Sequence, residues 1–289
     1  MRVIQTIAEL RAALAGERQI NLVPTMGNLH EGHLSLVRMA RNRNGVVVAS
    51  IFVNPLQFAP HEDFALYPRT IERDTELLLQ NGCDIVFAPD DKEMYPDPQE
   101  FVVRPAAALG DILEGSFRPG FFVGVSTVVL KLFGIIRPSA AVFGKKDYQQ
   151  LLVIDNMVKQ FALPIEILAG ETVRENSGLA LSSRNGYLSA RDRVEAAYLS
   201  TCLREVAEKV RAGDRDWQGI EKAAFDSLAS RGWHPDYVAI RRRSDLRNPR
   251  AAEPLIVLAA ARLGSSRLID NLEIQHPTRA EELEAHERE

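Results

Sequence analysis

The stretch Pro24-Thr25-Met26-Gly27-Asn28-Leu29-His30-Glu31-Gly32-His33 decides the fold that the sequence predicts. The apolar residues 20–23 before it are typical of a strand, and residues 34–40 after it are typical of a helix. A helix N-terminus presents free N–H groups and the positive end of the helix dipole, which together suit an anion. His30 and His33 are three residues apart, a spacing that places two side chains on one face of a helix. The sequence therefore predicts a phosphate site at a strand–turn–helix junction.

A second strand is predicted over residues 46–53, which are apolar on both faces, as in a parallel strand covered by helices. Together with the first strand and helix, it forms a βαβ unit. Further elements are predicted in order: strands over 84–88, 101–103, 140–143 and 165–168, and helices over 70–80, 106–113, 124–136 and 147–159. This order predicts an α/β fold, with a Rossmann-like parallel sheet domain over residues 1–175. Ligands bind such sheets outside the carboxyl ends of the strands.

A second, smaller α+β domain is predicted over residues 176–289. Its expected elements are helices over 190–211 and 217–230, followed by strands over 236–242, 255–261 and 267–274. A run of helices followed by a run of strands is typical of the α+β class. We expect this C-terminal domain to act as a lid on the larger one.

The composition predicts a globular cytoplasmic protein. The net charge is −4 with both signs spread along the chain, and Arg241-Arg242-Arg243 is the only basic cluster, so we expect no nucleic-acid partner. The longest apolar run, residues 254–263, is too short to span a bilayer, so we expect no membrane association. Cys83 and Cys202 fit no metal or redox spacing, and lone thiols are typical of a reducing compartment.

The common nucleotide-binding patterns are absent. No GxGxxG turn is present, and Gly144-Lys145-Lys146 lacks the preceding glycine and the following hydroxyl residue of a P-loop. The two histidines are three residues apart rather than four, which excludes the HExxH pattern of zinc proteases. Lys145 and Lys146 nevertheless follow a predicted strand at its carboxyl end, where they can contact phosphate. Ordinary surface lysines are the alternative.

Three other polar segments are weaker candidates for the same site. Ser182-Ser183-Arg184 lies in a turn-rich connection and can act as a charge clamp or be a plain loop. Asn54 and Gln57 follow the second predicted strand, and a capped turn is the simple alternative there. Asp74 can help to place Mg²⁺, although a solvated helix carboxylate is the more ordinary interpretation.

Five blocks of sequence, taken in order, resemble the pantothenate synthetase family, also called pantoate–β-alanine ligases. The blocks are Pro24 to His33, Phe52-Val53-Asn54-Pro55-Leu56-Gln57-Phe58, Tyr67-Pro68-Arg69-Thr70, Phe143-Gly144-Lys145-Lys146-Asp147-Tyr148-Gln149-Gln150, and Gly178 to Leu188. The His-x-Gly-His core alone would indicate only a nucleotidyl-transfer superfamily. Five separate blocks in family order are specific, and the resemblance runs over most of the chain.

The resemblance implies an ATP-dependent ligase that condenses pantoate with β-alanine to pantothenate. Family members work through a pantoyl-adenylate and release pyrophosphate and then AMP. ATP would be a substrate, Mg²⁺ would accompany it, and the protein would form a homodimer.

The resemblance also implies roles for individual residues. The catalytic residues would be His30, His33, Lys146 and Arg184. The ATP site would contain Pro24, Met26, His30, His33, Gly144, Lys146, Asp147, Val173, Leu181, Ser182, Ser183 and Arg184. The pantoate site would contain Met26, Asn54, Gln57 and Gln150. Asp74 would sit near the Mg²⁺.

Three positions depart from the usual family pattern. The family loop usually reads Arg-Pro-Gly-His-Phe-Arg-Gly, whereas this chain has Phe121 and Val123 in place of the His and the second Arg. Ser177 stands where an acid usually precedes Gly-Leu-Ala-Leu-Ser-Ser-Arg. Two other functions therefore stay open: a nucleotidylyltransferase that acts on a phosphate ester, and a catalytically weakened nucleotide-binding protein.

Overall fold

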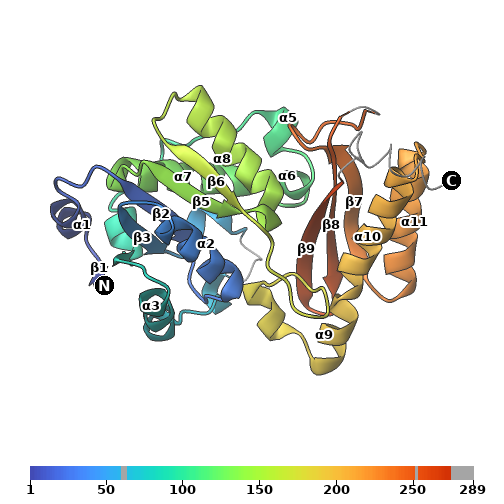
Figure 1. The fold of residues 1–289 in the computed structure, drawn as a ribbon, viewed down its shortest axis with the longest axis horizontal. Coiled ribbons are helices and arrows are strands. Elements are labelled where there is room, and N and C mark those ends of the chain that lie inside the picture. Colours follow the sequence, from blue (N-terminus) through green and yellow to red (C-terminus); the bar gives the residue numbers. More distant parts are fainter. Residues whose placement is uncertain (60–63, 251–252, 275–289) are drawn as a thin grey trace, which may run out of the picture. The chain divides into compact units, whose positions relative to one another are not determined.

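The computed structural model describes residues 1–59, 64–250 and 253–274 (Figure 1). The chain divides into two compact units. The first contains Met1–Val173 and Leu181–Ser183, and the second contains Arg174–Ala180 and the chain from Arg184 onward. The chain therefore crosses between the units at three places around residues 173–184.

The first unit is built on a six-stranded sheet in which all neighbouring strands are parallel. In spatial order its strands are β1 (Arg2–Ile4), β4 (Ile85–Phe87), β3 (Val46–Ile51), β2 (Ile20–Thr25), β5 (Ala140–Gly144) and β6 (Glu166–Gly170). The parallel sheet confirms the predicted fold class. The prediction of a strand over residues 101–103 is wrong, because Phe101 is 90% exposed and the segment has no strand partner among the described residues.

The order of the strands fixes where a ligand can bind. After β2 the chain continues to β3 and β4 on one side, whereas β5 and β6 are added on the other side of β2. The connections thus leave the carboxyl ends of β2 and β5 in opposite directions, which is the topological switch point of an open α/β sheet. The loop after Thr25 and the turn after Gly144 both start at this edge.

Helices cover both faces of the sheet (Figure 1). On one face they are α1 (Ile7–Ala13), α7 (Phe121–Ile136) and α8 (Tyr148–Gln160), and on the other they are α2 (Glu31–Arg41) and α3 (Ile71–Gln80). Along β2, Ile20 and Leu22 belong to the first core and Val23 to the second, as the alternation of a strand requires. Short elements connect these layers: the 3₁₀ turns η1 (Pro55–Gln57), η2 (Phe64–Leu66) and η3 (Lys145–Asp147), and the helices α4 (Asp91–Met94), α5 (Ala107–Gly110) and α6 (Glu114–Phe117). The helix predicted over 106–113 is therefore shorter than expected, because only residues 107–110 form α5, and the separate helix α6 begins after residue 113.

The second unit packs helices α10 (Tyr198–Arg211) and α11 (Trp217–Ser230) on an antiparallel sheet. Its strands are β7 (His234–Arg242), β8 (Leu255–Leu263) and β9 (Ser266–Ile274). The prediction of one helix over 190–211 is wrong, because the chain bends at Ala197 and separates α9 (Ala190–Ala196) from α10. Neither proline nor glycine stands at this bend, so the sequence carries no local signal for it.

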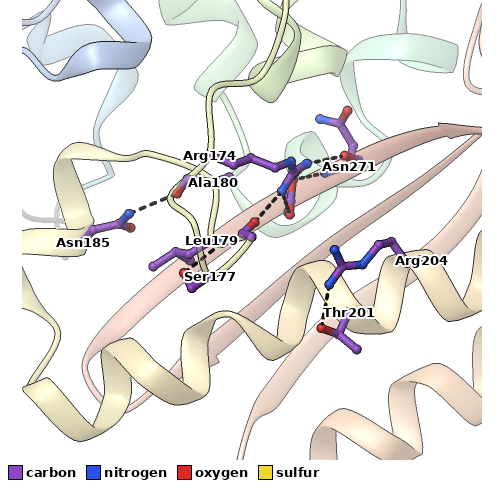
Figure 2. Close-up of polar contacts among 10 residues, drawn as sticks. Arg174, Ser177, Leu179, Ala180, Asn185, Thr201, Arg204 and Asn271 are labelled. Atoms are coloured by element: carbon purple, nitrogen blue, oxygen red, sulfur yellow. Dashed lines mark hydrogen bonds and ion pairs between the residues drawn. The ribbon is translucent and has the colours of Figure 1, made fainter.

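A short strap, residues 174–180, belongs to the second unit and is fastened to β9 (Figure 2). The Arg174 guanidinium donates to both oxygens of the buried Asp270 carboxylate, at 2.6 and 2.8 Å, and to the carbonyl of Asn271 at 3.1 Å. Gly178 has φ +92°, so the strap turns where glycine is favoured. The Ser177 hydroxyl accepts the Leu179 N–H at 3.4 Å, which is a local role for the residue that replaces the usual acid.

Cys83 and Cys202 are buried, free thiols, as predicted. In the described part of the chain, no helix combines the length and apolar content needed to cross a bilayer.

Candidate active site

The site begins in the loop that leaves the carboxyl end of β2. The Thr25 hydroxyl donates to the Ser50 carbonyl on β3 at 2.7 Å and accepts the Gly27 N–H at 3.2 Å. The chain then turns through two left-handed residues, Gly27 at φ +81° and Asn28 at φ +49°. Glycine and asparagine are the residues that tolerate this conformation. The sequence Gly27-Asn28 therefore sets the tight turn that leads from the strand into α2.

Asp74, near the start of α3, accepts hydrogen bonds from the backbone of the Gly27-Asn28 turn and fixes it. Its carboxylate is fully buried and accepts the N–H groups of Asn28 and Leu29 at 2.8 and 2.9 Å. The Thr70 hydroxyl also donates to it, at 2.9 Å. Mg²⁺ requires octahedral oxygen ligands and keeps several waters, which an enclosed carboxylate cannot accommodate. Direct metal coordination by Asp74 does not fit this geometry, and no cluster of three His, Cys, Asp or Glu suitable for a metal occurs among the described residues.

His30 is not inside the helix but is the N-cap of α2, with extended backbone angles. Its Nδ1 accepts the Gly32 N–H at 3.1 Å, and the Nδ1 of His33 accepts the His30 N–H at 3.4 Å. The two rings still lie together, with centroids 4.1 Å apart. Because each Nδ1 is an acceptor, we infer that each neutral ring carries its proton on Nε2. The N-terminal end of α2 thus presents two Nε2–H donors.

Both imidazoles are neutral at pH 7. Burial is the main cause that lowers the pKa of His30 to about 4, and the charges of Lys146 and Arg73 lower it further while Asp147 raises it. Burial, with smaller contributions from His30 and Lys146, lowers the pKa of His33 to about 3. A phosphate at this position would supply negative charge and raise both pKa values. The pair is therefore a neutral donor site that gains affinity for protons when an anion binds.

The turn after β5 brings Lys146 and Asp147 into the electrostatic range of this pair. The adjacent Lys145 is directed elsewhere, since its ammonium forms an ion pair with Glu171 at the end of β6. Asp147 is exposed and precedes α8 without capping it through its side chain. Of the two lysines, the structure therefore associates Lys146 with the histidines.

The loop after β3 supplies a network of amides around η1. Asn54 is 1% exposed, and its Nδ2 donates to the Gln57 Oε1 at 3.1 Å and to the Gly124 carbonyl at 3.2 Å. Its Oδ1 accepts the Tyr95 hydroxyl at 2.8 Å. The Gln57 Nε2 lies 3.0 Å from the Met26 Sδ. Asn54 is thus occupied by the protein and orients Gln57, which lies beside Met26.

Two consecutive glutamines at the start of α8 have different environments. Gln149 is buried, and its amide bonds the Glu114 N–H at 3.0 Å and the Leu109 and Ile112 carbonyls, both at 2.7 Å. Gln150 is half-buried, and its side chain makes no hydrogen bond to any residue that the structure describes. Its amide is accordingly available to a ligand.

The remaining candidates come from the chain around the crossing points. The Leu181 N–H donates to the Val173 carbonyl at 3.0 Å, so these two residues run side by side in the first unit. The Leu181 Cβ lies 3.9 Å from the position that a Cβ on Gly32 would take, beside the start of α2. The Ser183 and Tyr67 hydroxyls are 3.4 Å apart. Leu181 therefore lies beside the start of α2, and Pro24 in β2 and Gly144 in β5 lie near the carboxyl ends of their strands.

Arg184 belongs to the second unit, and Ser182 precedes it in the first. The role of Arg184 at the phosphates stays a prediction.

Sequence reasoning missed several residues that shape the site. Tyr95 supports Asn54, Gln149 fixes the segment before α6, and Gly124 lets α7 approach η1. A Cβ on Gly124 would lie 2.1 Å from the Leu56 carbonyl oxygen. These contacts join segments far apart in the chain, and no local pattern signals them.

The loop that departs from the usual family sequence also reaches η1. The Arg118 guanidinium donates to the Gln57 carbonyl at 3.2 Å and lies over the Phe121 ring. Val123 is an α7 residue whose carbonyl accepts the Thr127 hydroxyl at 2.7 Å. Arg118 is thus retained beside Gln57 despite the two substitutions.

Comparison with known proteins agrees with these features. A model of the pantoate-beta-alanine ligase family matches residues 2–273. A pantothenate synthetase of Leptothrix cholodnii is 60% identical over 285 residues, covering 94% of this chain and 100% of that protein. The crystal structure of pantothenate synthetase from Thermus thermophilus is 44% identical with a TM-score of 0.90, covering 96% of this chain and 100% of that one.

A third relative is the pantoate-beta-alanine ligase of Francisella tularensis, whose crystal structure is a complex with beta-gamma ATP and beta-alanine. It is 34% identical with a TM-score of 0.81, covering 94% of this chain and 97% of that one. The chain therefore belongs to the pantoate-beta-alanine ligase family and is a ligase.

Proposed function

We propose that the protein condenses pantoate with β-alanine in an ATP-dependent reaction, through a pantoyl-adenylate, and releases pyrophosphate and AMP. One observation carries the proposal. His30 and His33 present two Nε2–H donors at the N-terminal end of α2, beside Lys146, at the switch point of the sheet. This arrangement suits a polyphosphate. The Francisella tularensis relative, crystallised with beta-gamma ATP and beta-alanine, supports the assignment of substrates.

In the first step a carboxylate oxygen of pantoate attacks the α-phosphorus of ATP, and the bond from that phosphorus to the bridging oxygen of pyrophosphate breaks. The attack needs no protein nucleophile, because the carboxylate is already one. It needs alignment, and donors where negative charge accumulates on the phosphoryl oxygens. We assign the stabilisation of this negative charge to His30, His33 and Lys146. The positive end of the α2 dipole adds to their effect.

In the second step the neutral amine of β-alanine attacks the carbonyl carbon of the adenylate. The carbon–oxygen bond to AMP breaks, AMP leaves with that oxygen, and the new nitrogen centre loses a proton to give the amide. The adenylate must be protected from water between the two steps. The lid role predicted for the C-terminal domain would serve this purpose.

The acid substrate is assigned to the amide side of the site. Gln57 and Gln150 each offer a donor and an acceptor, which suits the hydroxyl and carboxylate oxygens of pantoate. The Gln150 side chain forms no hydrogen bond within the described chain, and Asn54 holds Gln57 beside Met26. Pantoate would therefore lie between Met26 and the two glutamines, with Asn54 as support.

The nucleotide is assigned to the strand edge and the crossing segments. The residues given to ATP are Pro24, Met26, His30, His33, Gly144, Lys146, Asp147, Val173, Leu181, Ser182, Ser183 and Arg184. The contacts of Leu181 with Val173 and with the start of α2 support this assignment. Arg184 would close over the triphosphate from the second unit.

Mg²⁺ and the homodimer stay predictions from the resemblance. The enclosed Asp74 carboxylate does not fit as a direct Mg²⁺ ligand. Light scattering of the purified protein tests the dimer.

The proposed function is tested by omitting each substrate in turn. With pantoate and ATP but no β-alanine, the protein should exchange labelled pyrophosphate into ATP; adding β-alanine should give pantothenate and AMP in equal amounts. A stable nucleotide product from a phosphate ester, without amide, would support a nucleotidylyltransferase instead. Binding of ATP and pantoate without any exchange would support a catalytically weakened protein.

A further inference from the structure

The Asp74 carboxylate is buried without a role in binding a ligand directly. It is 0% exposed, and the three donors that meet it, two backbone N–H groups and the Thr70 hydroxyl, are neutral. Burying a carboxylate is costly unless it is well hydrogen-bonded, and three short bonds supply that compensation. Its three hydrogen bonds therefore hold the carboxylate in one position.

The two backbone partners are consecutive. Successive N–H groups that point to one side form an anion-binding nest, and here Asp74 fills the nest made by Asn28 and Leu29. The next carbonyl is held as well, because the Arg73 guanidinium donates to the Leu29 oxygen at 3.2 Å. Both peptide groups that flank Leu29 are thus fixed by the first turn of α3.

The packing around Gly27 is equally close. A Cβ on Gly27 would lie 3.1 Å from the Asp74 Oδ2 and 3.1 Å from the Ile51 Cγ2. The backbone therefore lies close between α3 and the end of β3, and a side chain at this position would push its neighbours apart. One residue after Leu29 comes His30, whose imidazole caps α2 and lies against the His33 ring at a tilt of 38°. Movement of the turn would displace the cap directly.

We propose that Asp74 is a positioning residue for the adenylation step: it fixes the turn Gly27-Asn28-Leu29 so that the imidazoles of His30 and His33 keep their Nε2–H groups directed at the phosphates. This inference rests on the proposed function, because the adenylation step that the histidines would serve belongs to it. It replaces coordination of Mg²⁺ as the reason why an acid occupies this position. A misplacement of catalytic groups by about 1 Å can lower a rate by about 100-fold.

The test compares Asp74→Asn with Glu72→Gln. Asparagine has the same shape but turns an NH₂ group toward one of the two backbone donors, so the nest loses an acceptor. Glu72 lies in the same helical turn, is exposed, and loses the same charge when changed to Gln. Both variants are measured for pantoate-dependent pyrophosphate exchange over a range of ATP and Mg²⁺ concentrations, and for histidine ring ¹⁵N shifts by NMR.

We expect Asp74→Asn to lower kcat of the exchange by about 10- to 100-fold with a smaller effect on the KM for ATP. The Mg²⁺ concentration for half-maximal rate should not change. The ring shifts of His30 and His33 should move away from a single Nε2–H tautomer, whereas Glu72→Gln should resemble the unchanged protein in rate and shifts. Restoration of the Asp74→Asn rate by excess Mg²⁺, or histidine shifts and kcat equal to those of Glu72→Gln, would overturn the proposal.

The NMR measurement keeps the two proposals separate, because it does not depend on turnover. Absence of exchange in the unchanged protein would reject the proposed function, and the ring shifts would still test the effect of Asp74 on the histidines. If Asp74→Asn does not fold, Gly27→Ala tests the same contact from the loop, since its methyl group would push against the Asp74 carboxylate. The same fall in kcat and change in shifts are expected; unchanged values would overturn the proposal.

Discussion

The guanidinium carbon of Arg118 lies 3.7 Å from the centre of the Phe121 ring, and the same guanidinium donates to the Gln57 carbonyl at 3.2 Å. Phe121 stands where the family usually has histidine. The aromatic face therefore gives this chain its own means of holding Arg118 against the turn that carries Gln57.

Replacing Phe121 by Leu should weaken pantoate binding. A cation–π contact of this kind contributes about 0.5–1 kcal/mol at a partly exposed site, so the KM for pantoate should rise by roughly 2- to 5-fold. Phe121→Tyr keeps the ring face and should keep the KM. Phe101→Leu is the matched control, because Phe101 is 90% exposed on a segment outside the site. A KM for pantoate equal in Phe121→Leu and in the control would show that the stacked pair does not support Gln57.

Substitutions of the two adjacent lysines should have very different effects on the rate of pyrophosphate exchange. Lys146→Ala removes the positive charge that acts on both imidazoles and should lower the rate of pyrophosphate exchange by about 100-fold, as for loss of one charge-stabilising group. Lys145→Ala removes the ion pair with Glu171, and its exchange rate should stay within a few-fold of that of the unchanged protein. Steady-state exchange rates at saturating ATP check both. Equal losses in the two variants would contradict the assignment of Lys146 to the phosphates.

Substitutions of the two adjacent glutamines should affect different properties, pantoate binding in one case and thermal stability in the other. Gln150→Ala should raise the KM for pantoate with little change in Tm, because the Gln150 side chain makes no hydrogen bond in the described chain. Gln149→Ala leaves the Glu114 N–H and two carbonyls without their buried partner, at a cost of about 1–3 kcal/mol each, and should lower Tm clearly. Thermal unfolding and pantoate titrations check the pair. A large fall in Tm with Gln150→Ala would assign it a structural role.

Stability without substrates should fall on acidification because of the half-buried imidazole of His33. Burial lowers its pKa in the folded protein to about 3, below the value near 6.5 expected on unfolding. Between those values the unfolded chain binds the extra proton, so the free energy of unfolding decreases as the pH falls from 6.5 and is retained above it. Each pH unit in that window should cost about 1 kcal/mol. Urea unfolding of the unchanged protein and of His33→Gln should show a smaller pH dependence in the variant; identical slopes would contradict a half-buried neutral His33.

The sequence predicted the parallel sheet because its strands are apolar runs separated by amphipathic helices. It missed β1, since three residues at an edge carry too little pattern and pair with β4 over 80 positions away. It placed Thr70 correctly before a helix, yet the Thr70 hydroxyl bonds Asp74 rather than capping the helix end. Local sequence patterns predict where a helix starts. They do not predict which buried group will accept a hydrogen bond from the hydroxyl of the residue before it.

The candidate site likewise has some features that the sequence predicts and others that it does not. Gly27 and the two histidines are close in sequence, so their junction could be predicted from the chain alone. The contact of Asp74 with Asn28 spans 46 positions, and that of Arg118 with Gln57 spans 61. Such contacts depend on how helices pack on the sheet, and composition does not encode them locally. Likewise, burial makes the histidines neutral donors, which their spacing alone does not reveal.

Transfer of ¹⁸O from pantoate to AMP tests the central claim most directly. Pantoate labelled on both carboxylate oxygens is incubated with ATP, β-alanine and the protein, and the AMP is analysed by mass spectrometry. Attack of the carboxylate on the α-phosphorus predicts one ¹⁸O in each AMP formed. Unlabelled AMP, or release of ADP with labelled phosphate, would contradict the adenylate route.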